Sequence, residues 1–316
     1  MSDRGMMSLC VRQHDPRHDP SIDKAGWRAP LMGRILGACA LTGFCLLAAW
    51  SPWSPAQAAA PGTPTPAAGP STDEAEMVYI PAGEFTMGHD DNYDTKPVRR
   101  INLPAFYIDK YEVTDKRYKR FIDATGHKVP WSQEPAAAPY SWDWQKRMYP
   151  QGKGDDPVVL VSWEDAKAFC AWAGKGLPSE AQWEKAARGA NGNIYPWGAA
   201  WADRKTNTSE SAVRQTAPVG TFKEDVSPYG VYDLAGNVSE WVEEWFAPYP
   251  GNPIISYEEK QKYRVLRGGS WDYAHSIATG YHRQYATPQS QMTAIGFRCV
   301  KAAEESGGAS PKEQGR

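Results

Sequence analysis

The stretch Val265-Leu-Arg-Gly-Gly-Ser-Trp271 decides the fold of this 316-residue chain. Its first three residues are predicted to form a short strand, which two glycines then interrupt. Gly268 and Gly269 are expected where the backbone adopts a positive φ or approaches a neighbour closely. Ser270 and Trp271 are expected to turn inward, toward the interior of the domain.

A second stretch that is expected to form a strand, Ile295-Gly-Phe-Arg-Cys-Val300, follows near the end of the chain. It alternates as a half-buried strand does, and the residues predicted on its buried face are Ile295, Phe297 and Cys299. Residues 272–294 lie between the two stretches and are polar and aromatic, with neither helical nor strand periodicity. A long loop carried by two strands is a usual place for a functional site.

The N-terminal part of the chain, residues 1–58, is predicted to be a leader that directs export. Arg34 precedes residues 35–50, a run of sixteen residues without a charge, and Ala56-Gln-Ala58 follows as a small-x-small cleavage site. The run is shorter than the roughly 20 residues that span a bilayer, so a cleaved signal is favoured over a retained membrane anchor. Met32 offers an alternative start that gives the signal an ordinary length. We therefore expect a periplasmic or secreted protein, which contacts membrane only through an uncleaved leader.

Composition divides the remainder of the chain. Residues 59–75 are rich in Ala, Pro, Thr and Gly and predict a flexible linker, and residues 302–316 predict a disordered tail. Residues 76–301 remain as a single domain, large enough to bury a core. The formal net charge is −2 and no basic stripe is present, which argues against nucleic acid as a partner. The sequence predicts no particular oligomeric state.

Local patterns predict several elements of the domain. Residues 77–88 alternate around a Pro-Ala-Gly turn and predict a β-hairpin. Three helices are each expected to follow a capping residue, namely Thr114 before residues 115–124, Ser162 and Ser179. The loop over residues 128–156 is longer than a compact domain usually tolerates without a use for it, and it contains Trp131, Trp142 and Trp144.

One segment carries a family resemblance, Phe169-Cys-Ala-Trp-Ala-Gly-Lys-Gly-Leu-Pro-Ser-Glu-Ala-Gln-Trp-Glu-Lys-Ala-Ala-Arg-Gly189. Together with the Arg-Gly-Gly-Ser-Trp and Gly-Phe-Arg-Cys motifs, it resembles the formylglycine-generating, sulfatase-modifying-factor family over residues 77–301. The resemblance implies an α+β fold related to C-type lectins, low in regular secondary structure and built as a single domain.

The chain without its leader keeps two cysteines, Cys170 and Cys299. In an exported protein they are open to one disulfide or to two buried thiols. The resemblance favours the disulfide, because family members that contain a cystine place it at these two motif positions.

The turn Asp233-Leu-Ala-Gly-Asn-Val-Ser-Glu240 sets two carboxylates seven residues apart. On residue types alone, these acids are turn and surface residues. The resemblance implies instead a structural calcium loop, whose ligands are the side chains of Asp233 and Glu240 and the main-chain carbonyls of Gly236 and Val238. A second, weaker calcium site is implied at Asn207 and Thr208, although residues 209–215 lack a clear second ligand pair.

Enzymes of this family that make formylglycine hold copper(I) between two cysteines, five residues apart, just after the Arg-Gly-Gly-Ser motif. The matching positions of this chain are Tyr273 and Ala278. Neither side chain is a ligand for copper(I), which prefers thiolates. The resemblance therefore implies that copper-dependent formylglycine synthesis is absent. The His-x₃₋₄-His pattern of the iron-binding domain found in some relatives is also absent after the leader.

Polar and aromatic residues of the loop remain as a candidate pocket: Ser270, Trp271, Asp272, Tyr273, His275, His282 and Arg283. They are compatible with a bound iron or copper ion, or with a surface that binds a sugar or peptide without a metal. Two histidines seven residues apart have no fixed geometry, so ordinary loop histidines are the simpler interpretation.

Two functions follow from these observations. The chain resembles exported relatives that lack the cysteines, such as those that mature the siderophore pyoverdine, and this implies an oxidoreductase-like tailoring or maturation factor for a periplasmic peptide or enzyme. The alternative is a non-catalytic, lectin-like module that binds a peptide, a glycan or a partner protein. Its predicted binding floor consists of Trp131, Trp142, Trp144 and the Trp271 loop.

Overall fold

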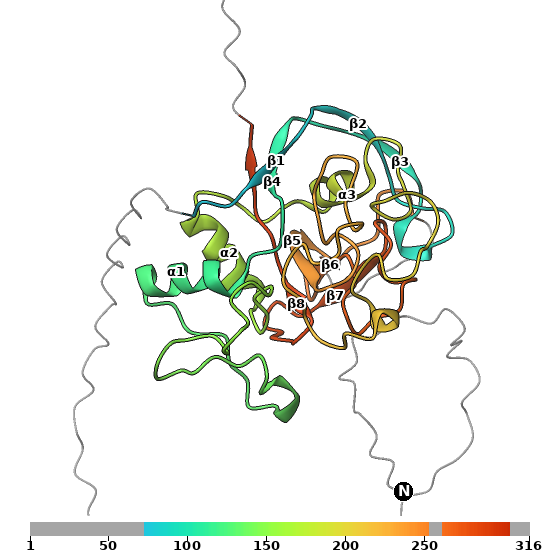
Figure 1. Ribbon diagram of the computed structural model, residues 1–316. Coiled ribbons are helices and arrows are strands. Elements are labelled where there is room, and N and C mark those ends of the chain that lie inside the picture. Colours follow the sequence, from blue (N-terminus) through green and yellow to red (C-terminus); the bar gives the residue numbers. More distant parts are fainter. Residues whose placement is uncertain (1–72, 253–260, 304–316) are drawn as a thin grey trace, which may run out of the picture. The chain divides into compact units, whose positions relative to one another are not determined.

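The computed structural model describes residues 73–252 and 261–303, in which regular elements are few and short (Figure 1). The predicted leader, most of the predicted linker and residues 304–316 of the predicted tail lie outside the described residues. The helices are α1 (Asp115–Thr125), α2 (Trp163–Trp172) and α3 (Glu180–Arg188), and the 3-10 turns are η1 (Tyr93–Thr95), η2 (Pro135–Ala137) and η3 (Ser209–Ser211). The predicted α+β fold, low in regular structure, is confirmed. None of the described helices is both long and apolar enough to cross a membrane.

The described strands form three sheets. The first is antiparallel, with β4 (Phe106–Asp109) between β1 (Met77–Ile80) and β9 (Val300–Ala302). The second pairs β2 (Gly83–Met87) with β3 (Arg99–Leu103). The third has the order β7-β6-β5-β8, formed by β7 (Arg283–Ala286), β6 (Arg264–Arg267), β5 (Ser239–Trp245) and β8 (Ile295–Gly296).

The hairpin predicted for residues 77–88 is wrong. Its two strands, β1 and β2, both exist, but β1 pairs with β4 and β2 pairs with β3. The chain changes direction just before β2, whose first residue, Gly83, has a φ of 127°. Each of the two strands then pairs with a strand that comes later in the sequence. Alternation located the strands correctly, but it carries no information about which strand is the partner.

The predicted helix caps are confirmed. The hydroxyl of Thr114 accepts the N–H of Arg117 at 3.3 Å, and α1 ends at Gly126, which adopts the left-handed conformation with a φ of 74°. Ser162 and Ser179 each form a complete capping box with the residue three positions later. These short helices therefore start and stop where local side chains satisfy their terminal N–H and C=O groups.

The two glycines of the Arg-Gly-Gly-Ser-Trp motif serve both purposes expected of them. Gly268 and Gly269 have φ values of 95° and 71°. A Cβ atom on Gly268 would lie 3.1 Å from the ring of Trp183, and one on Gly269 would lie 3.0 Å from the Cα of Ala278. Any larger residue would therefore be strained at these positions and would also push its neighbours away.

The strand predicted for residues 295–300 is only partly correct. β8 ends at Gly296, and all six residues are buried, so the stretch is not half-exposed. The reason is Arg298, whose guanidinium lies 2.7 and 2.8 Å from the two carboxylate oxygens of Glu240. Its Nη2 also donates to the carbonyl of Asp233 at 3.1 Å. A buried ion pair thus fills the face that the sequence pattern assigned to solvent.

Buried charges also join the two motifs that carry the family resemblance. Arg267, from the Arg-Gly-Gly-Ser-Trp motif, donates to Glu180 at 2.7 Å and to Glu184 at 2.8 Å, both on α3. Arg283 on β7 donates to Glu180 at 2.7 Å. Removing one partner would leave a charge buried without compensation, so these residues fix α3 against the four-stranded sheet.

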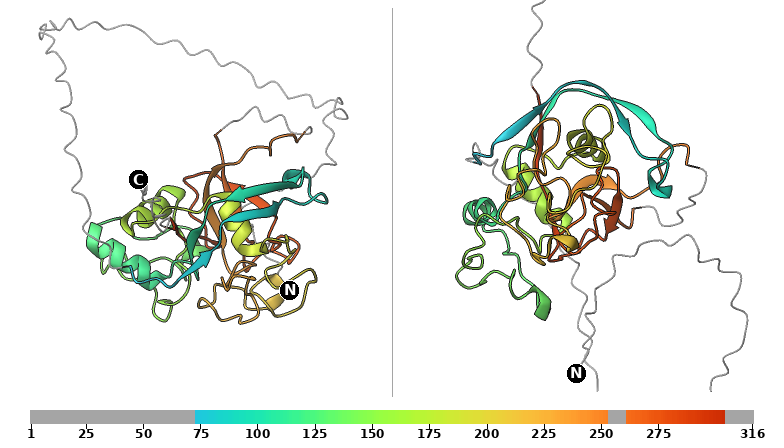
Figure 2. Two further views of the ribbon diagram at one scale, coloured as in Figure 1. Left: turned by 90° about the horizontal axis from the view of Figure 1, so that it is seen from above. Right: turned by 45° about the vertical axis from the view of Figure 1, so that its right-hand side comes forward.

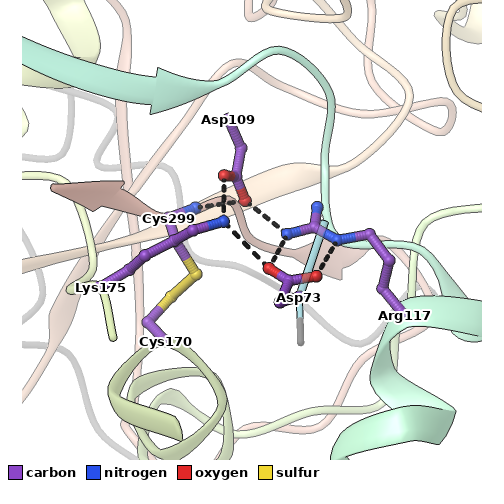
Figure 3. The surroundings of a disulfide bond; sticks show 6 residues. All are labelled: Asp73, Asp109, Arg117, Cys170, Lys175 and Cys299. Atoms are coloured by element: carbon purple, nitrogen blue, oxygen red, sulfur yellow. Dashed lines mark hydrogen bonds and ion pairs between the residues drawn. A yellow bond between two sulfur atoms is a disulfide. The ribbon is translucent and has the colours of Figure 1, made fainter. Parts of the chain in front are cut away.

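Cys170 on α2 and Cys299, just before β9, form a disulfide with their Cα atoms 5.6 Å apart (Figure 3). The backbone at Cys299 is held as well, because Asp109 donates its N–H to the Cys299 carbonyl at 2.9 Å. The bond therefore joins α2 to the end of the first sheet across 129 residues of sequence.

An ion cluster next to the disulfide includes Asp73, the first of the described residues. Asp73 lies 2.7 Å from Arg117 and 2.9 Å from Lys175, and Asp109 lies 2.8 Å from each of these cations (Figure 3). Asp73 belongs to the predicted flexible linker, yet the two cations of the cluster, Arg117 and Lys175, both form ion pairs with it. Ala302, assigned to the tail, is paired with Phe106 in the first sheet.

The loop over residues 128–156 projects away from the four-stranded sheet (Figure 2). It is nevertheless fastened to the domain at several points. The ring N–H of Trp142 donates to Asp115 at 3.1 Å, and Arg147 donates to the carbonyls of Ile122 and His127 at 3.2 and 2.7 Å. These contacts give a long segment with almost no regular structure a defined path.

Candidate functional site

The loop over residues 272–294 begins on a fixed base. Ser270 is buried, and its hydroxyl lies 2.5 Å from Oδ1 of Asp272. The N–H of Trp271 donates to the carbonyl of Asn237 at 3.0 Å, and its ring stacks on Tyr140 with centroids 6.5 Å apart. The first residues of the predicted pocket therefore have defined positions beside the turn at Asn237.

His275 is paired with a carboxylate from a distant segment. Its ring Nδ1 lies 2.8 Å from Oε1 of Glu210, and its backbone N–H donates to the same oxygen at 3.0 Å. Trp201 stacks on the imidazole, with centroids 4.7 Å apart. Burial acts to raise the pKa of Glu210, but the hydrogen bonds from His275 lower it to about 2, so the carboxylate is ionised at neutral pH.

The positions that match the copper thiolates hold a phenol and a methyl group. Ala278 is fully buried against Gly269, and its N–H donates to the carbonyl of His275 at 3.1 Å. Tyr273 is half-buried, and its carbonyl accepts the N–H of Ser209 at 2.9 Å. The pair therefore offers no soft ligand, and a buried methyl group stands at one of the two positions.

The predicted pocket does not form one group, because its last two residues lie elsewhere. The ring Nδ1 of His282 lies 3.2 Å from Nδ2 of Asn92, close to η1. Desolvation and the charge of Arg267 lower the pKa of His282 to about 4, so its imidazole is neutral at neutral pH. Arg283 belongs to the buried ion cluster with Glu180 and supports the fold.

A shared iron or copper site at the two histidines does not fit this arrangement. His275 faces Glu210 while His282 faces Asn92, so the two imidazoles have different partners. Within residues 73–252 and 261–303, no group of three or more His, Cys, Asp or Glu side chains is arranged to hold a metal ion. We derive no chemistry from a redox metal at this loop.

The two segments with implied calcium ligands lie side by side. The carbonyl of Asn207 accepts the N–H of Asn237 at 2.8 Å, and its side-chain amide donates to Asn237 Oδ1 at 3.1 Å. Thr208 and Val238 are buried next to these residues in the sequence. Gly236, with a φ of 99°, allows the close approach of the two segments.

The side chains of the implied calcium loop are largely committed to protein donors. Both oxygens of Glu240 accept from Arg298, and one also accepts the ring N–H of Trp183 at 2.9 Å. Oδ2 of Asp233 accepts the N–H of Gly220 at 2.6 Å. Glu240 therefore fits a guanidinium better than a calcium ion, and a calcium site here rests on Asp233 and the carbonyls of Gly236 and Val238.

Negative charge is nevertheless in surplus around Arg298. Glu112, Asp225 and Asp233 are buried near it in addition to Glu240. Burial and mutual repulsion raise the pKa values of Glu112 and Asp225 well above their usual range, and burial raises that of Asp233 to about 6. Bound protons or a cation would relieve this surplus, and the calcium site stays a prediction.

The comparison with known proteins agrees with these motifs. Residues 63–303 match the sulfatase-modifying factor enzyme 1-like domain. The formylglycine-generating enzyme of Streptomyces coelicolor is 34% identical over 311 residues, which cover 81% of this chain and 97% of that protein. The inactive C-alpha-formylglycine-generating enzyme 2 of Mus musculus is 34% identical over 276 residues, covering 72% and 86%. Among solved structures, PvdO from Pseudomonas aeruginosa superposes with a TM-score of 0.62 at 32% identity, covering 74% of this chain and 96% of PvdO.

Proposed function

Because this chain belongs to the family of sulfatase-modifying factor enzyme 1-like proteins, we propose that it is an exported maturation factor that oxidatively tailors a periplasmic peptide or enzyme. The observation that carries the proposal is the pair formed by His275, in the loop after the Arg-Gly-Gly-Ser-Trp motif, and Glu210 on η3. The similarity to PvdO, at 32% identity and a TM-score of 0.62, agrees with the resemblance to exported relatives that lack the copper cysteines.

In this proposal His275 positions the substrate and moves a proton. Glu210 engages Nδ1 and fixes the ring, so Nε2 is the nitrogen that accepts a proton from the substrate. A dehydrogenation removes two protons and two electrons from the substrate. Dioxygen accepts these two electrons and two protons, and hydrogen peroxide is the second product. The step requires no covalent bond between dioxygen and the protein.

The test uses the organism that encodes the chain, with the gene deleted and then restored as wild type, as His275→Ala or as Glu243→Gln. Glu243 is a half-buried residue of β5, paired with Lys167, and it serves as the matched control. Untargeted mass spectrometry of the periplasm should find a peptide or protein species that is two hydrogens lighter with wild type and control, but not with His275→Ala. Identical spectra in all strains would refute the proposal. The mass of the exported chain in the same samples should place its first residue close to Ala59.

A second candidate function is a non-catalytic module that binds a peptide, a glycan or a partner protein. It is favoured by two tryptophans of the loop over residues 128–156, Trp131 and Trp144, whose side chains are 43% and 64% exposed. The two indoles line the same cavities, and adjacent exposed apolar surface is typical of an interaction site. The inactive mouse relative is consistent with a family member that has lost catalysis.

A further inference from the structure

Two cavities that share lining residues lie on the loop over residues 128–156, and neither is lined by His275 or Glu210. One has a volume of about 570 Å³ and the other about 410 Å³. Trp131 and Trp144 line both cavities, so a ligand that contacts these indole rings can extend into either one, and we treat the pair as one groove. Both volumes are in the range of roughly 300–1,000 Å³ that is typical of small-molecule sites.

We propose that this groove, which we call the Trp131–Trp144 groove, binds a neutral oligosaccharide. The proposal gives a ligand to the second candidate function, and it holds whether or not the loop after Trp271 is catalytic. A pyranose ring has an apolar face of C–H groups, which stacks on an indole, and a rim of hydroxyls, which need both donors and acceptors.

The two tryptophans of the groove differ from the structural tryptophans of the domain. Trp142, beside them in sequence, is 2% exposed and donates to Asp115, and Trp163 donates to the carbonyl of Val242 at 2.8 Å. By contrast, the ring N–H groups of Trp131 and Trp144 meet no hydrogen-bond acceptor among the residues that the structure describes. Trp142 does line the larger cavity, as predicted for a binding surface, but it is 2% exposed and its ring N–H is already bonded to Asp115. Trp131 and Trp144 keep both a ring face and a donor for a ligand.

The rim of the groove is polar and carries little uncompensated charge. Amides and hydroxyls line it, from Gln133, Gln145, Gln291, Ser132 and Ser141. Three charged residues line it: Lys128 is 3.2 Å from Asp165, Asp143 is 3.3 Å from Lys146, and Glu134 forms no ion pair with the described residues. An amide offers a donor and an acceptor side by side, as sugar hydroxyls require. A groove without a cationic patch does not suit a phosphate, a sulfate or an acidic polymer.

The backbone around the groove does not suit an extended peptide. η2 uses its own N–H and C=O groups in a 3-10 turn, and Asp143 and Met148 exchange two backbone hydrogen bonds with each other, at 2.8 and 3.2 Å. No strand edge is therefore offered to a peptide backbone at this part of the described chain, which removes the main source of affinity in β-strand addition. Trp271, stacked on Tyr140 at the other end of η2, is not among the residues that line either cavity.

The groove is also pre-organised for a ligand. The carbonyl of Pro130 accepts the N–H of Trp142 at 2.9 Å, and the hydroxyl of Ser141 accepts the N–H of Ser132 at 3.2 Å. Gln291 is held by a bond of 3.0 Å from its amide to the carbonyl of Leu160. Because these bonds already fix the loop, little conformational entropy is lost when a ligand binds.

The test measures binding by isothermal titration calorimetry to cellohexaose, maltohexaose and chitohexaose, each a neutral oligosaccharide, and to a proline-rich peptide and a sulfated oligosaccharide. We expect at least one neutral oligosaccharide to bind to the full chain. Trp131→Ala and Trp144→Ala should each weaken that binding by about tenfold, since a stacked ring contributes roughly 1–1.5 kcal/mol. Met148→Ala is the matched control, because Met148 is 44% exposed in the same loop but lines neither cavity.

Thermal melts of the three variants should coincide with that of the wild type, because all three side chains are exposed. Failure of every neutral oligosaccharide to bind would overturn the proposal, and so would tryptophan variants that bind it as tightly as the wild type. Binding of the proline-rich peptide or the sulfated oligosaccharide alone would also overturn it and would assign the groove to that ligand. His275→Ala should leave oligosaccharide binding unchanged, so failure here is distinguishable from failure of the proposed reaction.

Discussion

Glu210 and His275 are 65 residues apart in the sequence, yet one carboxylate oxygen of Glu210 meets both the ring and the backbone N–H of His275. The first of these contacts fixes the imidazole, and the second fixes the path of the loop itself. Glu210 lies on η3, directly after the segment of Asn207 and Thr208. The segment that the resemblance assigned to a weak calcium site is therefore the support of the candidate catalytic histidine.

Substitution of Glu210 should expose this dual role. In Glu210→Ala the amide of His275 loses its acceptor, and its hydrogen exchange should become faster by more than tenfold, as expected when a bonded N–H is freed. In Glu210→Gln the amide oxygen can still accept, so exchange at His275 should stay close to that of wild type. Exchange measured residue by residue by NMR checks this. Equal protection in wild type and Glu210→Ala would mean that the loop is held by other contacts.

Short-range features of this fold were predictable from the sequence, and long-range ones were not. Thr114, Ser162 and Ser179 cap helices through residues three positions away, so their roles are visible in the local sequence. The glycines at 268 and 269 belong to the same class, since a positive φ is a local property. The partners of the first strands depended on residues far along the chain, and the hairpin prediction failed for that reason.

The candidate site was less predictable than the fold, again because its contacts are distant. An alternating pattern placed Arg298 on an exposed face, and only the three-dimensional position of Glu240, 58 residues earlier, explains its burial. Glu210 carried no signal beyond being an acid in a short polar segment. His282 was grouped with His275 because the two are close in sequence, whereas the structure gives them different neighbours.

The disulfide should be formed in the exported protein and should contribute substantially to stability. Unfolded, unreduced protein should contain no titratable thiol, and reduction or the double variant Cys170→Ala with Cys299→Ala should lower the free energy of unfolding. For a loop of 129 residues, the chain-entropy model gives about 4–5 kcal/mol. Denaturant unfolding with and without reductant measures the difference. Two free thiols in the unreduced protein would contradict the bond.

Glu244 should make the protein lose stability as the pH rises toward neutrality. Burial raises its pKa from 4.5 to about 7, although its carboxylate accepts the N–H of Glu180 at 2.7 Å. The folded state therefore keeps a proton that the unfolded state releases, and this contribution is complete below pH 4.5 and is lost as the pH rises through 7. In Glu244→Gln, the decline of melting temperature between these pH values should become shallower. A slope in Glu244→Gln that equals that of wild type would contradict the assignment.

Calcium, if it binds at the loop of Asp233, should stabilise only the folded state. A chelator should then lower the melting temperature of the wild type, by an amount equivalent to about 2.7 kcal/mol if the ion was present at a hundredfold excess over its Kd. Asp233→Asn should remove this sensitivity. Glu240 is a poor choice for the test, because its loss would strand the buried charge of Arg298 whether or not calcium binds. If neither the chelator nor added calcium changes the melting temperature, the loop is an ordinary turn that binds no calcium.

The protein should be unable to convert a sulfatase cysteine to formylglycine. That chemistry needs two thiolates for copper(I), and the matching positions hold the phenol of Tyr273 and the buried methyl group of Ala278. Wild-type protein incubated with a Cys-x-Pro-x-Arg peptide, copper(I), dioxygen and reductant should leave the peptide unchanged in mass. Formation of the aldehyde would show that the fold has a second route to the same product.

The control for this experiment is the double variant Tyr273→Cys with Ala278→Cys. Ala278 packs against Gly269, where a Cβ on the glycine would already lie 3.0 Å from the Cα of Ala278, so a sulfur at position 278 has little room to turn toward that side. We therefore expect the variant to fold and to bind copper(I) weakly, and to regain little or no formylglycine activity. Copper binding without turnover would show that restoring the two ligands is not sufficient, and that the surrounding site also differs from that of an active enzyme. Full activity would instead mean that this chain lacks only the two thiolates, and that His275 and Glu210 do not prevent formylglycine synthesis.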